Sequence, residues 1–134
     1  MLKKNNDIKK EIIRILPKGI REIFSKINLD YKKLTEIRLR ADKPILINYN
    51  TCEYFISNYS ELSDLIEDAY VICEEEIKEL VQYVCNYSVY AHEEDIKQGF
   101  ITIVGGHRIG LAGKVVIEGD RIKNIKNISC VNIR

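Results

Sequence analysis

The sequence predicts an α+β domain with N-terminal helices, a mixed or antiparallel sheet, and a central helix pair packed on one face. Apolar residues recur every three or four positions near the N-terminus and over residues 74–86, which is the spacing of a helix face. Residues 34–40 and most of 100–133 instead alternate apolar and polar residues, as half-buried strands do. Isoleucine occurs 23 times, and such an excess of β-branched residues favours strands.

The first 28 residues are predicted to be helical. One helix covers residues 7–16, with Asn6 or Asp7 as its N-terminal cap and Pro17 ending it. A short second helix follows, with its apolar side formed by Ile20, Ile23, Phe24 and Ile27. Residues 34–134 form the α+β part of what we expect to be one domain, because 134 residues suit a single core.

Three strands are expected between the N-terminal helices and the central helix. The first covers residues 34–40, and a turn over 41–44 follows because Pro44 cannot donate a ladder hydrogen bond. The next strands are centred on residues 45–47 and 54–56. Within residues 57–73 the pattern is mixed: Leu62, Leu65 and Ile66 fit a helical turn, whereas residues 70–72 look extended.

The central helix pair is predicted over residues 74–86 and 88–97. Glutamates occupy residues 74–76, where the helix dipole favours negative charge. After Gly99 the chain predicts strands joined by a hairpin turn at Gly105–Gly106 and a second turn near 118–120. The last strand contains a bulge or break, because its isoleucines are three residues apart at Ile122, Ile125 and Ile128.

Charge is strongly segregated along a chain whose net charge is only +1. Residues 1–50 carry net +7, residues 51–96 net −11 and residues 97–134 net +5. Near-neutrality argues against a protein held to DNA by bulk charge alone. We expect the oppositely charged segments to pair partly within the domain and partly with neighbouring subunits.

The four cysteines lack CxxC spacing and have too few histidine partners for a zinc site. We interpret them as buried free thiols of a reducing compartment. No stretch approaches the ~20 apolar residues of a membrane span, and the N-terminus lacks the apolar core of a signal peptide.

The glycine-rich stretch 105–114 does not fit a phosphate-binding loop. In a Walker A motif a glycine precedes the Gly-Lys pair by five positions, but here Arg108 stands there and Val115 follows Lys114. The glycines are better explained by a hairpin, a bulge and close strand packing. Arg108 and Lys114 nevertheless share one strand face, where they can meet phosphates or solvent.

No catalytic constellation can be assembled from the polar residues. His92 and His107 are the only histidines, and adjacent carboxylates on a helix point in different directions. Arg38 and Arg40 lie two apart on a strand and so point the same way, toward either the acidic residues of 51–96 or a partner.

Several segments together resemble one protein family. They are Ile12–Pro17 (IIRILP), Glu36–Pro44 (EIRLRADKP), Asn86–Gly99 (NYSVYAHEEDIKQG), Phe100–Lys114 (FITIVGGHRIGLAGK) and Asn127–Arg134 (NISCVNIR). The chain resembles the N-terminal domain of the stage III sporulation protein AA family of endospore-forming bacteria. The resemblance covers nearly the whole chain, and the GFITI-x-GGHR-x-G-x-AGK block is its most specific part. The apolar alternation running to Arg134 also reads as a strand cut short, as in a fragment of a longer protein.

The resemblance implies a function in assembly. The family's full-length protein carries, after this region, a RecA-like ATPase domain similar to those of hexameric secretion and type IV pilus ATPases. ATP and Mg²⁺ are the cofactors expected for that absent domain, whereas residues 1–134 are expected to bind no cofactor or metal and to have no catalytic residue. Arg108, Lys114 and Arg134 are candidates to approach the nucleotide in the full-length ring, because arginine forks suit phosphate oxygens.

The resemblance also implies a place in the cell. We expect a cytoplasmic homo-oligomer on the mother-cell side, peripheral to the inner membrane. It would dock below a membrane protein of the mother-cell-to-forespore channel complex, with neither a nucleic-acid partner nor a membrane span of its own. The alternatives are a single-stranded nucleic-acid-binding module that uses the basic strands 97–134, and a protein-docking module unrelated to any ATPase.

Overall fold

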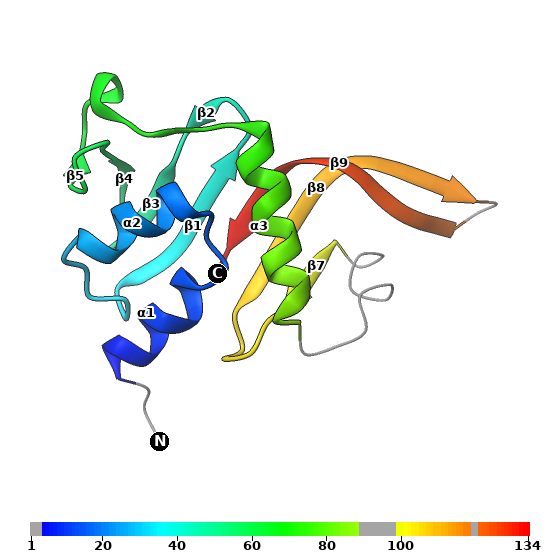
Figure 1. The fold of residues 1–134 in the computed structure, drawn as a ribbon, viewed down its shortest axis with the longest axis horizontal. Coiled ribbons are helices and arrows are strands. Elements are labelled where there is room, and N and C mark those ends of the chain that lie inside the picture. Colours follow the sequence, from blue (N-terminus) through cyan, green and yellow to red (C-terminus); the bar gives the residue numbers. More distant parts are fainter. Residues whose placement is uncertain (1–3, 89–98, 119–120) are drawn as a thin grey trace.

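The structure, a computed structural model, describes residues 4–88, 99–118 and 121–134, and only the backbone of residues 114–118 and 121–127. The described residues form three α-helices, two antiparallel sheets and one 3₁₀ turn, so the predicted α+β class is confirmed (Figure 1). The helices are α1 (Asn5–Ile13), α2 (Lys18–Lys26) and α3 (Glu74–Asn86). None of them is long and apolar enough to cross a lipid bilayer.

Seven strands form the main sheet, in the order β5-β4-β3-β1-β9-β8-β7, and every pairing in it is antiparallel. Their bounds are β1 (Leu34–Arg40), β3 (Leu46–Tyr49), β4 (Cys52–Ile56), β5 (Leu62–Ser63), β7 (Phe100–Thr102), β8 (Arg108–Glu118) and β9 (Arg121–Ile133). A small second sheet pairs β2 (Lys43–Pro44) with β6 (Val71–Ile72), and η1 covers Ile66–Asp68.

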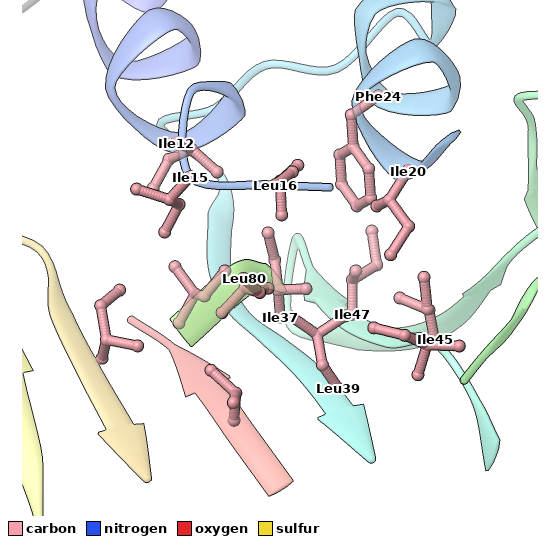
Figure 2. Packing of buried hydrophobic residues seen from close by; sticks show 14 of the residues in the cluster. Ile12, Ile15, Leu16, Ile20, Phe24, Ile37, Leu39, Ile45, Ile47 and Leu80 are labelled. Atoms are coloured by element: carbon pink, nitrogen blue, oxygen red, sulfur yellow. The ribbon is translucent and has the colours of Figure 1, made fainter. Parts of the chain in front are cut away.

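The three helices lie on one face of the main sheet (Figure 1). Figure 2 shows side chains of the α1–α2 region, such as Leu16 and Phe24, facing Ile37 of β1 and Ile47 of β3. Leu80 of α3 belongs to the same cluster, and all five side chains are at most 1% exposed. The core therefore occupies the space between the helices and one side of the sheet, where apolar surface leaves water.

Several sequence predictions agree with this structure. The strand over 34–40 and the helix over 74–86 have the predicted bounds. The irregular isoleucine spacing near the end of the chain coincides with two register shifts between β8 and β9. On the β9 strand they fall at residues 127–129 and at residue 123. Alternation then resumes, with Val131 and Ile133 buried.

Four local predictions differ wholly or in part from the structure. Helix α1 begins at Asn5 and ends at Ile13, and neither Asn6 nor Asp7 caps it, since Lys4 occupies the cap position without a side-chain bond. Lys43–Pro44 is a short strand rather than part of a turn, because a two-residue edge strand tolerates proline. Of the three residues that fit a helical turn, Leu62 is in strand β5, and the turn begins only at Ile66, as the 3₁₀ helix η1. The cysteines are free, but Cys52 and Cys73 are exposed rather than buried.

The second helix of the predicted central pair falls mainly on residues 89–98, outside the described residues. His92 and the turn at 119–120 lie outside them as well. In the described part of the chain, α3 is the one helix of that pair. It starts with a capping box in which the Glu76 side chain accepts the Cys73 backbone N–H at 3.1 Å.

Truncating Leu80 should measure how far the fold depends on α3. Leu80 is fully buried, so Leu80→Ala should lower the free energy of unfolding by about 2–5 kcal/mol through lost burial and a residual cavity. Lys78→Ala on the same helix, where the side chain is 59% exposed, should change it by less than about 0.5 kcal/mol. Urea denaturation of both variants measures the difference, and equal effects would contradict the packing of α3 against the sheet.

Candidate interface on the outer face of the sheet

The glycine block forms a turn that receives helix α1. Gly105 and Gly106, between β7 and β8, have φ values of +105° and +85°, which side-chain-bearing residues rarely adopt. Glu11 of α1 lies against this turn, with its Oε1 3.1 Å from His107 Nε2. A methyl group at Gly105 would overlap the Glu11 carboxylate. The glycines therefore permit a turn and a close approach, and they do not cradle a phosphate.

Arg14 attaches the same helix to the same turn. Its Nη2 donates a hydrogen bond of 3.2 Å to the Val104 carbonyl, and its guanidinium carbon lies 4.2 Å from the centroid of the Tyr87 ring. These contacts hold the end of α1 against the chain that leads into the β7–β8 turn.

Arg108 and Arg134 are directly opposite each other on adjacent strands. Their backbones exchange two hydrogen bonds, of 3.1 and 2.9 Å, and both residues are exposed. Like charges at opposite positions on neighbouring strands repel each other. Each of these two arginine side chains has a different neighbour. Arg108 stacks on Phe100 at 4.5 Å, whereas an Arg134 Nη lies 3.8 Å from Glu36 Oε1.

Glu36 is the carboxylate that lies among these arginines. It is 9% exposed, and its Oε1 lies 3.4 Å from Arg38 Nε. Its other oxygen accepts a hydrogen bond of 3.4 Å from the Asn48 amide. Arg38 extends the chain of charges, since its Nη1 is 3.5 Å from Glu53 on β4. A buried carboxylate needs such donors to offset its lost hydration.

These residues share the side of the sheet opposite the helices, which we call the outer face. Ile37 and Leu39 point into the core at 1% and 0% exposure, so the alternate positions of β1 point away from the three helices. The same alternation around the buried Ile109 and Ile133 places the other two arginines on that side. The outer face carries Glu36, Arg38, Arg40, Arg108 and Arg134.

The remaining predicted site residues are less closely connected. Arg40 is exposed at the end of β1, opposite Cys130. Lys114 pairs with Lys126 along the β8–β9 ladder, and its side chain is outside the described part. Sequence reasoning did not identify Glu36, and it named the acidic residues of 51–96 as possible partners of Arg38 without singling out Glu53. The signal for Glu36 was its position two residues before Arg38 on one strand face, whereas Glu53 becomes a neighbour only through strand pairing.

A small pocket of about 210 Å³ opens beside the outer face, at the end where β1 begins and β9 ends. Apolar residues of α1, β1 and β9 line it, together with Tyr31, Glu36, His107 and Arg134. Tyr31 is 3% exposed, its hydroxyl has no hydrogen-bond partner among the described residues, and burial raises its pKa to about 12. Within the described residues, no cluster of histidine, cysteine and carboxylate side chains is suited to a metal ion.

Comparison with known proteins relates this arrangement to one family. The sequence profile described as "Sporulation stage III, protein AA" matches residues 6–134. The chain belongs to this family. It is also 32% identical, over 125 residues, to "Stage III sporulation protein AA" of Bacillus subtilis (strain 168). That alignment covers 92% of this chain but 37% of the relative, so the chain spans little more than a third of the relative's length. Membership gives the chain a sporulation-related role, and the suspected resemblance is confirmed.

Replacing Gly105 should destabilise this family member more than replacing Gly106. Both substitutions to alanine place a Cβ at positive φ, but only the one at Gly105 meets the Glu11 carboxylate. Gly106→Ala should cost about 1–2 kcal/mol, and Gly105→Ala clearly more. In a Glu11→Ala background the two costs should converge, as a double-mutant cycle by chemical denaturation will measure. Equal costs in both backgrounds would show that Glu11 does not press on the turn.

Replacing Tyr31 by phenylalanine should be neutral or stabilising at pH 7, because it removes a buried hydroxyl that has no partner. Tyr70→Phe, which removes a hydrogen bond of 2.6 Å to Glu76, should instead cost about 1–2 kcal/mol.

The same Tyr31 substitution has an alkaline signature. Burial raises the pKa of Tyr31 from 10.0 to about 12 on folding, so the contribution of the neutral side chain is intact below pH 10 and is lost as pH rises toward 12. The stability advantage of Tyr31→Phe over the parent should therefore grow between pH 10 and 12. An advantage that does not change with pH, measured by urea denaturation, would contradict this.

Proposed function

We propose that the chain is the N-terminal assembly and docking domain of a sporulation ATPase that energises the mother-cell-to-forespore channel complex. The observation that carries the proposal is membership of the stage III sporulation protein AA family over residues 6–134. The relative's greater length leaves room for a second domain, which we propose to be the ATPase. ATP and Mg²⁺ belong to that domain, and the present chain contributes binding surface rather than turnover.

The outer face supplies the contact surface in this proposal. Arg108 and Arg134 are exposed and adjacent, so in a hexameric ring they can present guanidinium groups to a neighbouring subunit or to the phosphates of its nucleotide. Lys114 is proposed to extend this row along β8. From β1, Glu36 contacts Arg134 and Arg38, and Arg40 continues the row of cations at the far end of that strand.

We propose that this ring lies in the cytoplasm on the mother-cell side, peripheral to the inner membrane and below a membrane protein of the channel complex. The nucleic-acid alternative is less well supported. A single-strand binder needs a continuous positive track along the backbone, but Glu36 and Glu53 interrupt the cations of the outer face. Family membership does not favour that alternative either.

A chimera tests the proposal. The aligned region of the Bacillus subtilis relative is replaced by this chain, and the purified chimera is assayed for ATP hydrolysis and for size by sedimentation velocity. The parent chimera should hydrolyse ATP as an oligomer, whereas residues 1–134 alone should not exceed the blank. Arg108→Ala with Arg134→Ala should lower turnover at least tenfold, because the guanidinium groups are needed at the shared site.

Lys78→Ala is the matched control, since it removes an exposed cation from α3 rather than from the outer face. Thermal melting of each isolated chain checks that the variants fold. ATP hydrolysis by residues 1–134 would overturn the proposal. So would a folded double-arginine chimera that keeps the turnover and size of the Lys78→Ala control.

A further inference from the structure

Exposed apolar side chains gather in one short segment. In the described residues, five large apolar side chains are at least half exposed, and four of them belong to residues 59–71. They are Tyr59 at 77%, Leu65 and Ile66 at 59% each, and Val71 at 52%. Single exposed apolar residues are normal on protein surfaces, but a cluster of them indicates a binding surface.

The fold holds this segment in place. The Ser57 hydroxyl, on a residue that is 3% exposed, accepts the backbone N–H groups of Tyr59 and Glu61, both at 3.1 Å. The Asn58 side chain donates to the carbonyls of Asp68 and Ala69, at 3.0 and 3.3 Å. These bonds bring the β4–β5 turn against η1, so the exposed apolar side chains belong to one structured surface.

All the charged residues of the same segment are acidic. Between Lys43 and Lys78 the sequence contains no lysine or arginine. Residues 59–71 contain Glu61, Asp64, Glu67 and Asp68, and within the described residues no ion pair engages any of these four carboxylates. Four carboxylates and four apolar side chains thus form what we call the acidic apolar surface. Most of it lies at the β5 edge of the main sheet, opposite the β7 edge, and Val71 belongs to β6 of the small sheet (Figure 1).

We propose that the acidic apolar surface docks a basic, amphipathic segment of another protein, in which lysines or arginines alternate with apolar side chains. The apolar residues of such a segment cover Leu65 and Ile66, and its cations pair with the surrounding carboxylates. The outer face of a second copy of this chain is a poor match. Three of its four arginines already contact Glu36, Glu53 or Phe100, and among its described residues none is a half-exposed large apolar side chain.

A synthetic helical peptide of leucine and lysine, with the leucines on one face, is the probe. Two control peptides are used: one with glutamate in place of lysine, and one with the same composition in scrambled order. The whole chain is labelled with ¹⁵N and titrated with each peptide. The leucine-lysine peptide should shift amide resonances within residues 57–72, and neither control should do so.

Two variants separate the apolar and electrostatic contributions. Leu65→Ser with Ile66→Ser should weaken binding at least tenfold, and so should Asp64→Lys with Glu67→Lys. Val104→Ser is the matched control, because Val104 is 50% exposed but lies outside the segment, and it should leave the affinity unchanged. Since all these side chains are exposed, the thermal midpoints of the variants should stay close to that of the parent.

Four results would overturn the proposal. The first is equal binding of the scrambled peptide, which would show attraction by charge alone. The second is resonance shifts centred outside residues 57–72, and the third is no binding at low salt. Concentration-dependent dimerisation of the chain that Leu65→Ser with Ile66→Ser abolishes would also overturn it, by assigning the surface to a second copy. None of these readouts involves ATP hydrolysis or the outer-face arginines.

Discussion

The pairing of β1 with β9 is the constraint on which the rest of the structure depends. It joins residues 37–40 to residues 130–133, and so connects the β5-β4-β3-β1 meander to the β9-β8-β7 meander in one sheet. Contacts this distant in sequence carry a large loop-closure cost. Burial of Ile37, Leu39, Val131 and Ile133 on the helix side of that pairing offsets it. The shared core beneath α1, α2 and α3 exists only when both meanders are present.

The register of the same pairing also creates the outer face. Side chains alternate along a strand, so a slip of one residue would turn Ile37 and Leu39 to the outside and carry Arg38 into the core. The cost of burying an unpaired guanidinium adds to the loss of apolar burial, and both oppose the slip. Glu36 then lies beside Arg134 because the correct register puts it there. The arrangement of charges on the outer face is thus a consequence of core packing on the other side.

Local periodicity made part of this predictable from sequence. The helix over 74–86 and the strand over 34–40 were found with their bounds because each has a strong period of its own. Alternation along β1 also placed Arg38 and Arg40 on one face, but it could not show that Arg108 and Arg134 share that face. Long-range partners were not predictable: Glu53 meets Arg38 only across two strand pairings. Asn5, the first residue of α1, donates a hydrogen bond to the Leu29 carbonyl, and short-range capping rules cannot show a contact 24 residues away.

The segregation of charge along the chain has two different structural outcomes. Where positive and negative segments meet inside the sheet, Arg38 of the first segment pairs with Glu53 of the second. Beyond β4, the carboxylates of residues 61–68 lie in the same segment as the exposed apolar side chains, at the β5 edge of the sheet. Repulsion among like charges at one edge lowers stability, and in the described residues no intramolecular cation compensates for it there. This cost in stability falls at the β5 edge, beside apolar residues that Ser57 and Asn58 hold in place. Recognition of a partner therefore explains the acidic and apolar composition of that edge better than folding does.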